Sequence, residues 1–254
     1  MAGIRIVALT DHDTVAAVPA FAAEAASAGL YALPGVEVSS WWRGAIYHVL
    51  LYNIDLRNPW LVATLSSLWG EINDVAARAV AQLHSHGYEL PDLDSLRQGG
   101  DLLPIHVIVA AMQGGVASDF MGVIDALREM GISLTAGVDM AEAVAAGHAA
   151  GGLAVLAHPG RTELGFTPAG PDAVVEMVAK TGLDGIEVYH WSHGPAEEAT
   201  YGRLAAERGL LISCGSDSHG PRSKRPLRGR EAALCRDLLE RCGIEVVSSK
   251  RRDR

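Results

Sequence analysis

The sequence predicts an α/β fold of parallel β/α units that carries a helical insertion. Short β-branched or apolar runs alternate with Ala-rich helical stretches near both ends of the chain, a pattern typical of parallel β/α units. Between these parts, apolar residues recur mostly at helical spacing and convincing strand runs are few. We therefore expect residues 1–65 and 148–254 to form one α/β domain and residues 66–147 to form a helical insertion subdomain.

The strands are predicted where apolar runs end in polar clusters. The first unit is a strand over Ile4–Leu9, a helix over Val15–Ala28 and a strand over Tyr31–Val38. Later strands follow segments rich in Ala, Glu and Lys, and they are expected at Leu153–Ala157, Gly185–Tyr189 and Leu210–Cys214. Because functional groups of β/α barrels gather at the carboxyl ends of the strands, these polar clusters should converge on one mouth.

The insertion contains a literal His-x-His sequence, which we interpret as a helix end. His84 and His86 close the predicted helix NDVAARAVAQLHSHG, and Gly87 is a typical helix stop. Residues two apart on a helix point to different faces, so the two imidazoles are not expected to bind one ion.

Composition narrows the class of protein. The chain has 254 residues, of which 49% are hydrophobic, and no apolar run approaches the roughly 20 residues of a membrane-spanning helix. The N-terminus lacks a secretory pattern, and we expect a cytoplasmic protein with no membrane partner. Its three cysteines lack C-x-x-C spacing and should be reduced thiols. A net charge of −9 argues against an extended nucleic-acid surface but allows a small phosphorylated substrate.

Histidines and carboxylates stand at the predicted strand ends, and they are the ligands that hold zinc, manganese or iron in hydrolytic sites. A shared carboxylate such as Glu37 could bridge two ions, and a hydroxide between them would attack phosphorus. In GSDSHG, glycines permit a sharp turn while the two ligand candidates face one way. The candidates are His12, Glu37, His48, His158, Asp217 and His219.

The motifs LTDHDT, PGVEVS, YHVLLYNID, AHPGR, GIEVY and GSDSHG together resemble the PHP family, named for polymerase and histidinol phosphatase domains, across nearly the whole chain. The chain is most similar to the branch that acts on nucleoside 3',5'-bisphosphates and on the 5' ends of short RNAs. The resemblance implies a distorted (β/α)7-type barrel and a phosphoric ester hydrolase with up to three divalent ions, Mn, Zn or Fe.

The resemblance also assigns roles to residues. It places His12, Glu37, His48, His158, Asp217 and His219 on metal-ligand positions. It implies that His12, Glu37, His158 and Asp217 act in catalysis through a metal-bound hydroxide, and that Arg161 and His193 bind the substrate.

The chain departs from the family pattern in two places. The family's first strand, which ends in H-x-H, would lie upstream of Met1, and the insertion has Pro104 where the branch carries an Arg. By the resemblance, Glu37, His48 and His158 are a complete ligand set, whereas the sets of His12 with His219 and of Asp217 with Glu37 are incomplete. We therefore expect fewer than three ions here.

Two functions remain open from the sequence. The first is a phosphoesterase of small nucleotides whose recorded start is too late. A barrel without its first strand would expose an unpaired edge, which self-association could also cover. The second is a non-catalytic metal-binding PHP-like protein. Amide hydrolysis ranks below both, because no strand-end Lys is present to bridge two ions.

Overall fold

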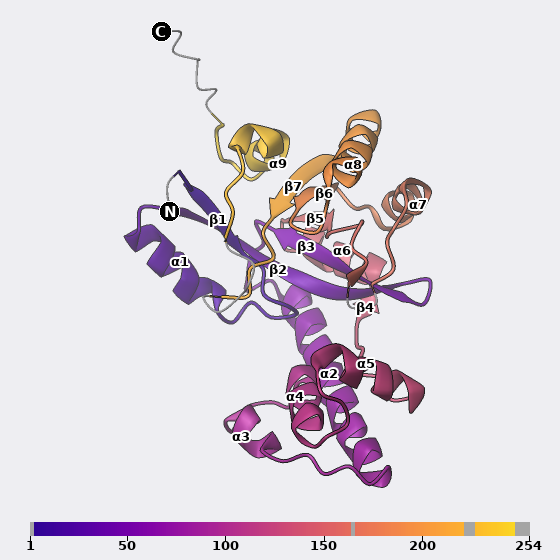
Figure 1. Ribbon diagram of the computed structural model, residues 1–254. Helices are drawn as coiled ribbons and strands as arrows, with labels where there is room; N and C mark the ends of the chain where they lie inside the picture. Colours follow the sequence, from indigo (N-terminus) through magenta and orange to yellow (C-terminus); the bar gives the residue numbers. More distant parts are fainter. Residues whose placement is uncertain (1–2, 164–165, 221–226, 247–254) are drawn as a thin grey trace. The chain divides into compact units, whose positions relative to one another are not determined.

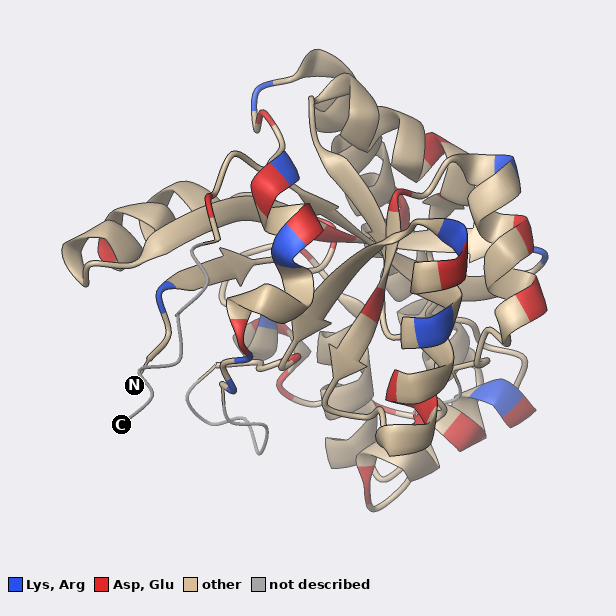
Figure 2. Ribbon diagram, turned by 90° about the horizontal axis from the view of Figure 1, so that it is seen from above, with Lys and Arg blue, Asp and Glu red and all other residues tan. Residues whose placement is uncertain are grey.

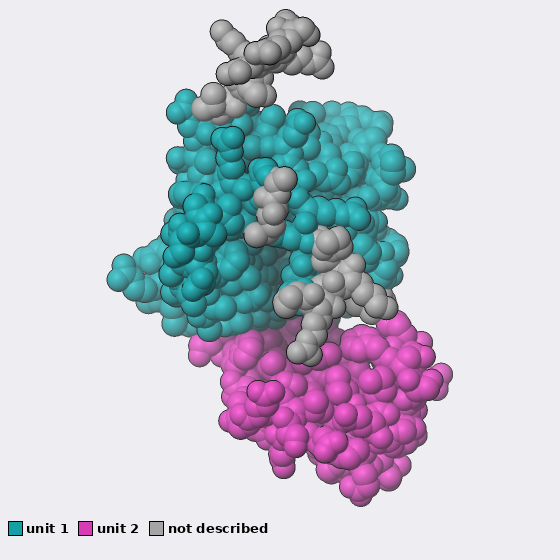
Figure 3. Space-filling view, turned by 60° about the vertical axis from the view of Figure 1, so that its left-hand side comes forward, with its two compact units in different colours: residues 1–63, 139–254 teal, residues 64–138 magenta. Residues whose placement is uncertain are grey.

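The computed structural model describes residues 3–163, 166–220 and 227–246. The chain separates into two compact units (Figure 3). Unit 1 comprises Met1–Ala63 and Asp139–Arg254, and unit 2 comprises Thr64–Val138. The insertion thus interrupts the α/β part of the chain, and each unit has its own core.

Unit 1 is built on a mixed, curled sheet (Figure 1), and the predicted α/β class is confirmed. The strands follow the order β1-β2-β3-β5-β6-β7. They span Ile6–Leu9 (β1), Tyr31–Trp42 (β2), Ala45–Tyr52 (β3), Leu153–Leu156 (β5), Gly185–His190 (β6) and Leu211–Gly215 (β7). The pairs β1–β2, β5–β6 and β6–β7 are parallel, as predicted, but β3 runs antiparallel to both β2 and β5. A hairpin at Arg43 and Gly44 therefore replaces the helical crossover between β2 and β3.

Two of the helices of unit 1 begin at Pro and are followed by Gly. The helices of this unit are α1 (Val18–Ser27), α6 (Met140–Ala149), α7 (Pro171–Thr181), α8 (Pro195–Arg208) and α9 (Arg236–Arg241), with the 3-10 helix η2 (Ala232–Cys235). Helices α7 and α8 each have Pro in the first turn, and both end at a glycine with positive φ, Gly182 and Gly209. Helix α1 begins at Val18 rather than the expected Val15, because Pro19 occupies its first turn.

The core of unit 1 lies on both faces of the sheet. All residues of β5 are buried, as expected for an uninterrupted apolar strand covered on both sides. On one face, Leu50 and Val155 cluster with Leu238 of α9. Helix α6 packs against β2, β3 and β5. For this reason α6 belongs to unit 1, and the second unit boundary lies at 138/139 rather than at the predicted 147/148.

Unit 2 is helical over its described length. Helix α2 (Pro59–Ser85) crosses its first boundary, α3 (Leu93–Arg97), α4 (Pro104–Gln113) and α5 (Phe120–Glu129) follow, and the two-residue strand β4 (Val138–Asp139) marks its end. Buried alanines of α2 and apolar residues of α4 and α5 form one core cluster. His84 and His86 are exposed at the end of α2, before Gly87 with φ +84°. No helix of the described residues is long and apolar enough to cross a membrane.

Candidate metal centre

The segment after β1 places His12 beside Glu37 of β2. His12 and Glu37 form an isolated parallel bridge. The Asp13 N–H donates to the Glu37 carbonyl at 2.8 Å, and the Glu37 N–H donates to the Asp11 carbonyl at 3.1 Å. These bonds extend the pairing of β1 with β2 beyond the end of β1. Main-chain pairing therefore holds the first two ligand candidates together.

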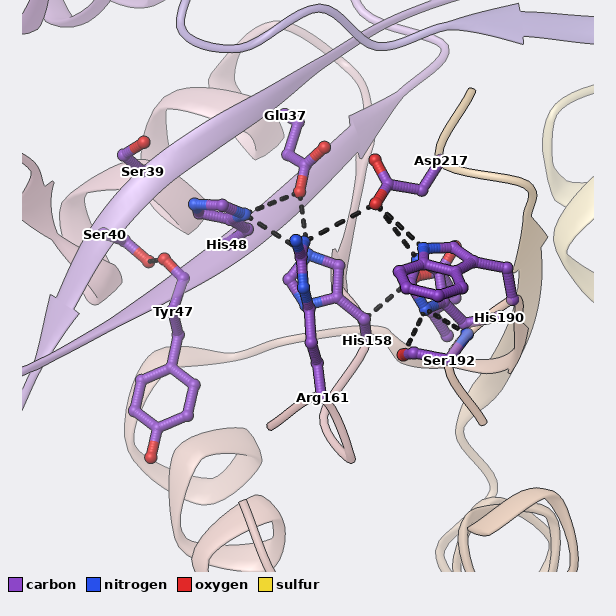
Figure 4. A network of polar contacts seen from close by, with 12 residues as sticks. Glu37, Ser39, Ser40, Tyr47, His48, His158, Arg161, His190, Ser192 and Asp217 are labelled. Atoms are coloured by element: carbon purple, nitrogen blue, oxygen red, sulfur yellow. Dashed lines mark hydrogen bonds and ion pairs between the residues drawn. The ribbon is translucent and has the colours of Figure 1, made fainter. Parts of the chain in front are cut away.

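Glu37, His48 and His158 meet at a buried point (Figure 4). Glu37 Oε1 lies 2.7 Å from His48 Nδ1 and 3.0 Å from His158 Nε2. The two imidazole nitrogens lie 3.3 Å apart. His48 pairs with Ser39, two residues along β2 from Glu37, so both side chains share one face of the hairpin. The residues that the sequence suggested as a complete ligand set are thus in mutual contact.

The three donor atoms have the spacing and chemistry of a metal site. Ligand atoms bound tetrahedrally to one zinc ion at about 2.0–2.1 Å lie about 3.3 Å apart. Burial by itself would raise the pKa of the Glu37 carboxyl group. The charges of His48 and His12, with hydrogen bonds from His158 and His48, outweigh burial and hold that pKa well below its usual value. The group is therefore a buried carboxylate anion, and a divalent ion would fit among these three donor atoms.

His12 extends the cluster toward solvent. Single ligand atoms of His12, Glu37 and His48 all lie within 4.8 Å of one another. The rings of His12 and His48 are 4.9 Å apart between centroids, and those of His12 and His219 are 6.0 Å apart. His12 is exposed whereas Glu37 and His48 are buried. Two overlapping sets that share Glu37 and His48 can thus be drawn, one with His158 and one with His12.

Asp217 is surrounded by hydrogen-bond donors and cations. The Trp191 indole N–H donates to its Oδ2 at 3.0 Å, and Arg161 Nη1 lies 3.5 Å from the same oxygen. Asp217 itself has φ +46°, in the left-handed region that Asp adopts more often than most other non-glycine residues. The half-exposed His219 donates from Nδ1 to the Asp217 carbonyl oxygen at 2.9 Å. The GSDSHG segment therefore presents Asp217 inward and His219 outward, and the expectation that both face one way is wrong, because Asp217 is not in an extended conformation.

Arg161 and His193, the expected substrate-binding residues, lie in different surroundings. Arg161 is buried, and its guanidinium carbon lies 4.5 Å from the centre of the Phe166 ring. His193 has both ring nitrogens bonded to the main chain, because Nδ1 donates to the Val188 carbonyl at 2.9 Å and Nε2 accepts the Gly160 N–H at 3.0 Å. In this arrangement His193 supports the turn that presents Arg161.

Glu187 is a buried acidic residue beside the site to which the sequence reasoning assigned no role. It lies on β6, is 3% exposed, and its Oε2 accepts the backbone N–H of His158 at 2.9 Å. Burial raises the pKa of Glu187 well above its usual value, the His158 hydrogen bond opposes this, and the nearby charges of Glu37 and Asp217 raise it further. The available signal was a single acidic residue in an otherwise apolar strand, GIEVYH.

His190, the last residue of β6, lies near both His158 and Asp217. It is 2% exposed, and its ring centroid lies 5.1 Å from that of His158. Burial, with the charges of His158, His193 and Arg161, lowers the pKa of His190 to about 2. His190 is therefore a neutral imidazole at ordinary pH.

Known proteins with similar sequences are phosphoesterases. No family model matched the chain. It is 30% identical over 225 residues to the 5'-3' exoribonuclease Rnm of Escherichia coli, covering 86% of this chain and 76% of that protein. It is 29% identical over 243 residues to the 3',5'-nucleoside bisphosphate phosphatase of Chromobacterium violaceum, covering 93% of this chain and 83% of that protein.

Solved structures share the fold. A chain from Bifidobacterium adolescentis, described as a metal-dependent phosphoesterase, superposes with a TM-score of 0.77 at 25% identity, covering 94% of this chain and 86% of that chain. An amidohydrolase from Chromobacterium violaceum, with bound sulfate and no metal, superposes with a TM-score of 0.75 at 29% identity, covering 93% of this chain and 86% of that chain.

The curled α/β sheet and its cluster of His12 after β1, Glu37 on β2 and His48 on β3 define a metal-dependent hydrolase. The relatives narrow this class to phosphoric ester hydrolysis. The chain belongs to the PHP family of metal-dependent phosphoesterases, as its motifs suggested.

Proposed function

We propose that this chain hydrolyses phosphomonoesters of small nucleotides, such as nucleoside 3',5'-bisphosphates, and the 5' ends of short RNAs. The contact of Glu37, His48 and His158 carries the proposal, because it supplies a complete buried ligand set beside Arg161. The Arg161 N–H donates to the His158 carbonyl at 3.0 Å. Metal ligand and phosphate-binding candidate are therefore joined through one short turn.

The substrate class follows from the relatives and from charge. The similar proteins include a bisphosphate phosphatase and exoribonucleases. Lys and Arg are scattered among Asp and Glu in the view of Figure 2, and the net charge is −9. A long RNA is bound through many phosphates that need clustered cations. The scattered charges favour a small nucleotide or a short chain end instead.

The proposed metal ligands are His12, Glu37, His48, His158, Asp217 and His219. Manganese, zinc and iron all suit such a mixture of imidazole and carboxylate. A bound divalent ion would polarise a phosphoryl oxygen and lower the pKa of an attacking water molecule. The protein's own contribution is orientation, because hydrogen bonds fix the Glu37 carboxylate and the His158 ring before an ion arrives.

Arg161 is the proposed phosphate-binding cation. Its guanidinium group can pair with two phosphoryl oxygens at once. Stacking on Phe166 and the contact with Asp217 Oδ2 at 3.5 Å hold the group in place. His193 contributes by accepting the Gly160 N–H, which orients the turn that carries Arg161.

The test is hydrolysis of adenosine 3',5'-bisphosphate and of a short 5'-phosphorylated RNA. The purified chain is stripped with a chelator and reloaded separately with Mn, Zn or Fe. Release of phosphate or of nucleotide that depends on metal, and that is lost in Glu37→Gln, supports the proposal. Full metal uptake without turnover of either substrate would refute it.

A further inference from the structure

Two buried N–H groups near Asp217 have no hydrogen-bond partner among the residues that the structure describes. They are Arg161 Nε and His190 Nε2. Arg161 is 6% exposed and His190 is 2% exposed. A buried donor without an acceptor costs about 1–3 kcal/mol, so such groups are rare unless a ligand or water completes them. Both residues lie within 4 Å of Asp217 Oδ2, Arg161 through Nη1 at 3.5 Å and His190 through Nε2 at 3.8 Å.

The hydrogen bonds of His190 determine that Nε2 is a donor. The backbone N–H of Ser192 points at His190 Nδ1 from 3.3 Å, and the Ser192 hydroxyl lies 2.8 Å from the same nitrogen. A main-chain N–H can only donate, so Nδ1 accepts. The ring hydrogen is therefore on Nε2. This places an oriented N–H group where Figure 4 shows Asp217, Arg161 and His190 facing one another.

No described side chain accepts this hydrogen at bonding distance. The nearest carboxylate oxygen, Asp217 Oδ2, lies at 3.8 Å, which is too long for a hydrogen bond. It already accepts the Trp191 indole N–H at 3.0 Å. Arg161 Nε is in the same position, since Glu163 Oε2 lies 3.9 Å from it. The His190 imidazole and the Arg161 guanidinium thus each have an N–H group that could donate to a ligand with more than one oxygen.

We propose that His190 binds the phosphoryl group of the substrate, its Nε2–H and the Arg161 guanidinium donating to phosphoryl oxygens beside Asp217. This inference rests on the proposed function, and it adds His190 to the residues that the sequence reasoning assigned to the substrate. The residue was hidden in the sequence, because His193 rather than His190 occupies the position that the family resemblance highlights.

The test measures binding of inorganic phosphate by calorimetry to chelator-treated and to Mn-loaded protein. His190→Leu preserves most of the buried volume and removes the donor, whereas His190→Gln keeps an N–H near the Nε2 position. The proposal expects phosphate to bind roughly tenfold or more weakly to His190→Leu. His190→Gln should bind phosphate within about threefold of the native chain, because its amide restores a donor.

His190→Asn is a second variant without a donor at the Nε2 position, because its shorter amide stays near Ser192. Its phosphate affinity tests the proposal if His190→Leu fails to fold. His148→Leu is the matched control, since His148 Nε2 lies against Asp184, 2.8 Å from its Oδ2. This control should bind phosphate as the native chain does. The KM for adenosine 3',5'-bisphosphate should rise in the donor-deficient variants more than kcat falls.

Unchanged phosphate affinity in His190→Leu or His190→Asn would overturn the proposal, even if kcat fell, because a residue that only orients Asp217 would lower kcat alone. Failure of native protein to bind phosphate in both metal states would also overturn it. Failure of the proposed function looks different, namely no nucleotide turnover while phosphate binding and its dependence on His190 persist.

Discussion

Glu187 Oε2 accepts the backbone N–H of His158 at 2.9 Å, which joins a buried carboxyl group of β6 to the metal-ligand candidate that follows β5. His158 has φ +26°, a sparsely populated conformation that the surroundings must stabilise. A Cβ on Gly215 would lie 2.2 Å from Glu187 Oε1, so β7 approaches the same carboxyl group from the other side. The Glu187 side chain thus lies between the segment that follows β5 and the end of β7.

Glu187→Gln should change how stability depends on pH. The pKa of Glu187 is raised well above 4.5 in the folded chain. As pH rises above 4.5, the unfolded chain releases this proton before the folded chain does, so the native protein loses stability up to the raised pKa. The amide keeps an oxygen for the His158 N–H and does not titrate. In urea denaturation of chelator-treated protein, the free energy of unfolding of the variant should therefore rise relative to that of the native chain from pH 4 to pH 8. Parallel stability curves would contradict the assignment.

Glu37→Gln should abolish tight metal binding. The carboxylate lies within 3.0 Å of both His48 Nδ1 and His158 Nε2, and loss of its charge removes the group that both sets of ligands share. Metal affinity should fall by about 100-fold or more, since even loss of a supporting partner costs about 10–100-fold. Metal content after loading and gel filtration measures this. Glu176→Gln, whose partner Arg43 lies on the β2–β3 hairpin, should retain native metal content.

Asp13→Ala should destabilise unit 1. Asp13 Oδ1 accepts the Ser39 N–H at 2.6 Å, and Oδ2 accepts the Ser39 hydroxyl at 2.8 Å. Ser39 lies opposite His48 in the β2–β3 register. Leaving the Ser39 N–H without an acceptor should lower the free energy of unfolding by about 1–3 kcal/mol. Ser39→Ala loses only the hydroxyl bond and should cost less. If Ser39→Ala lowers the free energy of unfolding as much in the Asp13→Ala background as in the native chain, the hydrogen bonds between Asp13 and Ser39 are not the cause.

Gly185→Ala should disturb the pairing of β6 with β7. A Cβ at this position would lie 2.4 Å from the Leu211 carbonyl oxygen, and both groups belong to the main chain of paired strands. The strands must separate, at a cost of about 1–3 kcal/mol in unfolding free energy. Gly170→Ala is the control, because nothing lies within 4 Å of its Cβ position. Equal effects of the two substitutions in thermal unfolding would exclude the steric explanation.

Local patterns of the sequence predicted much of the fold. The uninterrupted apolar run of β5 indicated a strand covered on both faces, and Pro171 with Gly182 marks the two ends of α7. The sequence also indicated which candidate ligands would gather, and Glu37, His48 and His158 are in contact, although Glu37 and His48 lie within β2 and β3 rather than at strand ends. These features depend on the spacing of apolar residues and on local backbone conformation, both of which a short stretch of sequence specifies.

The remainder depended on groups far apart in the chain. The antiparallel β3 was not expected, because strand direction depends on which neighbours a strand pairs with, here β2 and β5. The support that Glu187 gives to His158, and the main-chain contacts of His193, likewise join different strands and turns. The sequence by itself determined the family and named the candidate ligands, since both reside in local motifs. Only the tertiary structure decided which nitrogen faces which oxygen, because a hydrogen-bond partner is chosen by three-dimensional proximity rather than by spacing along the chain.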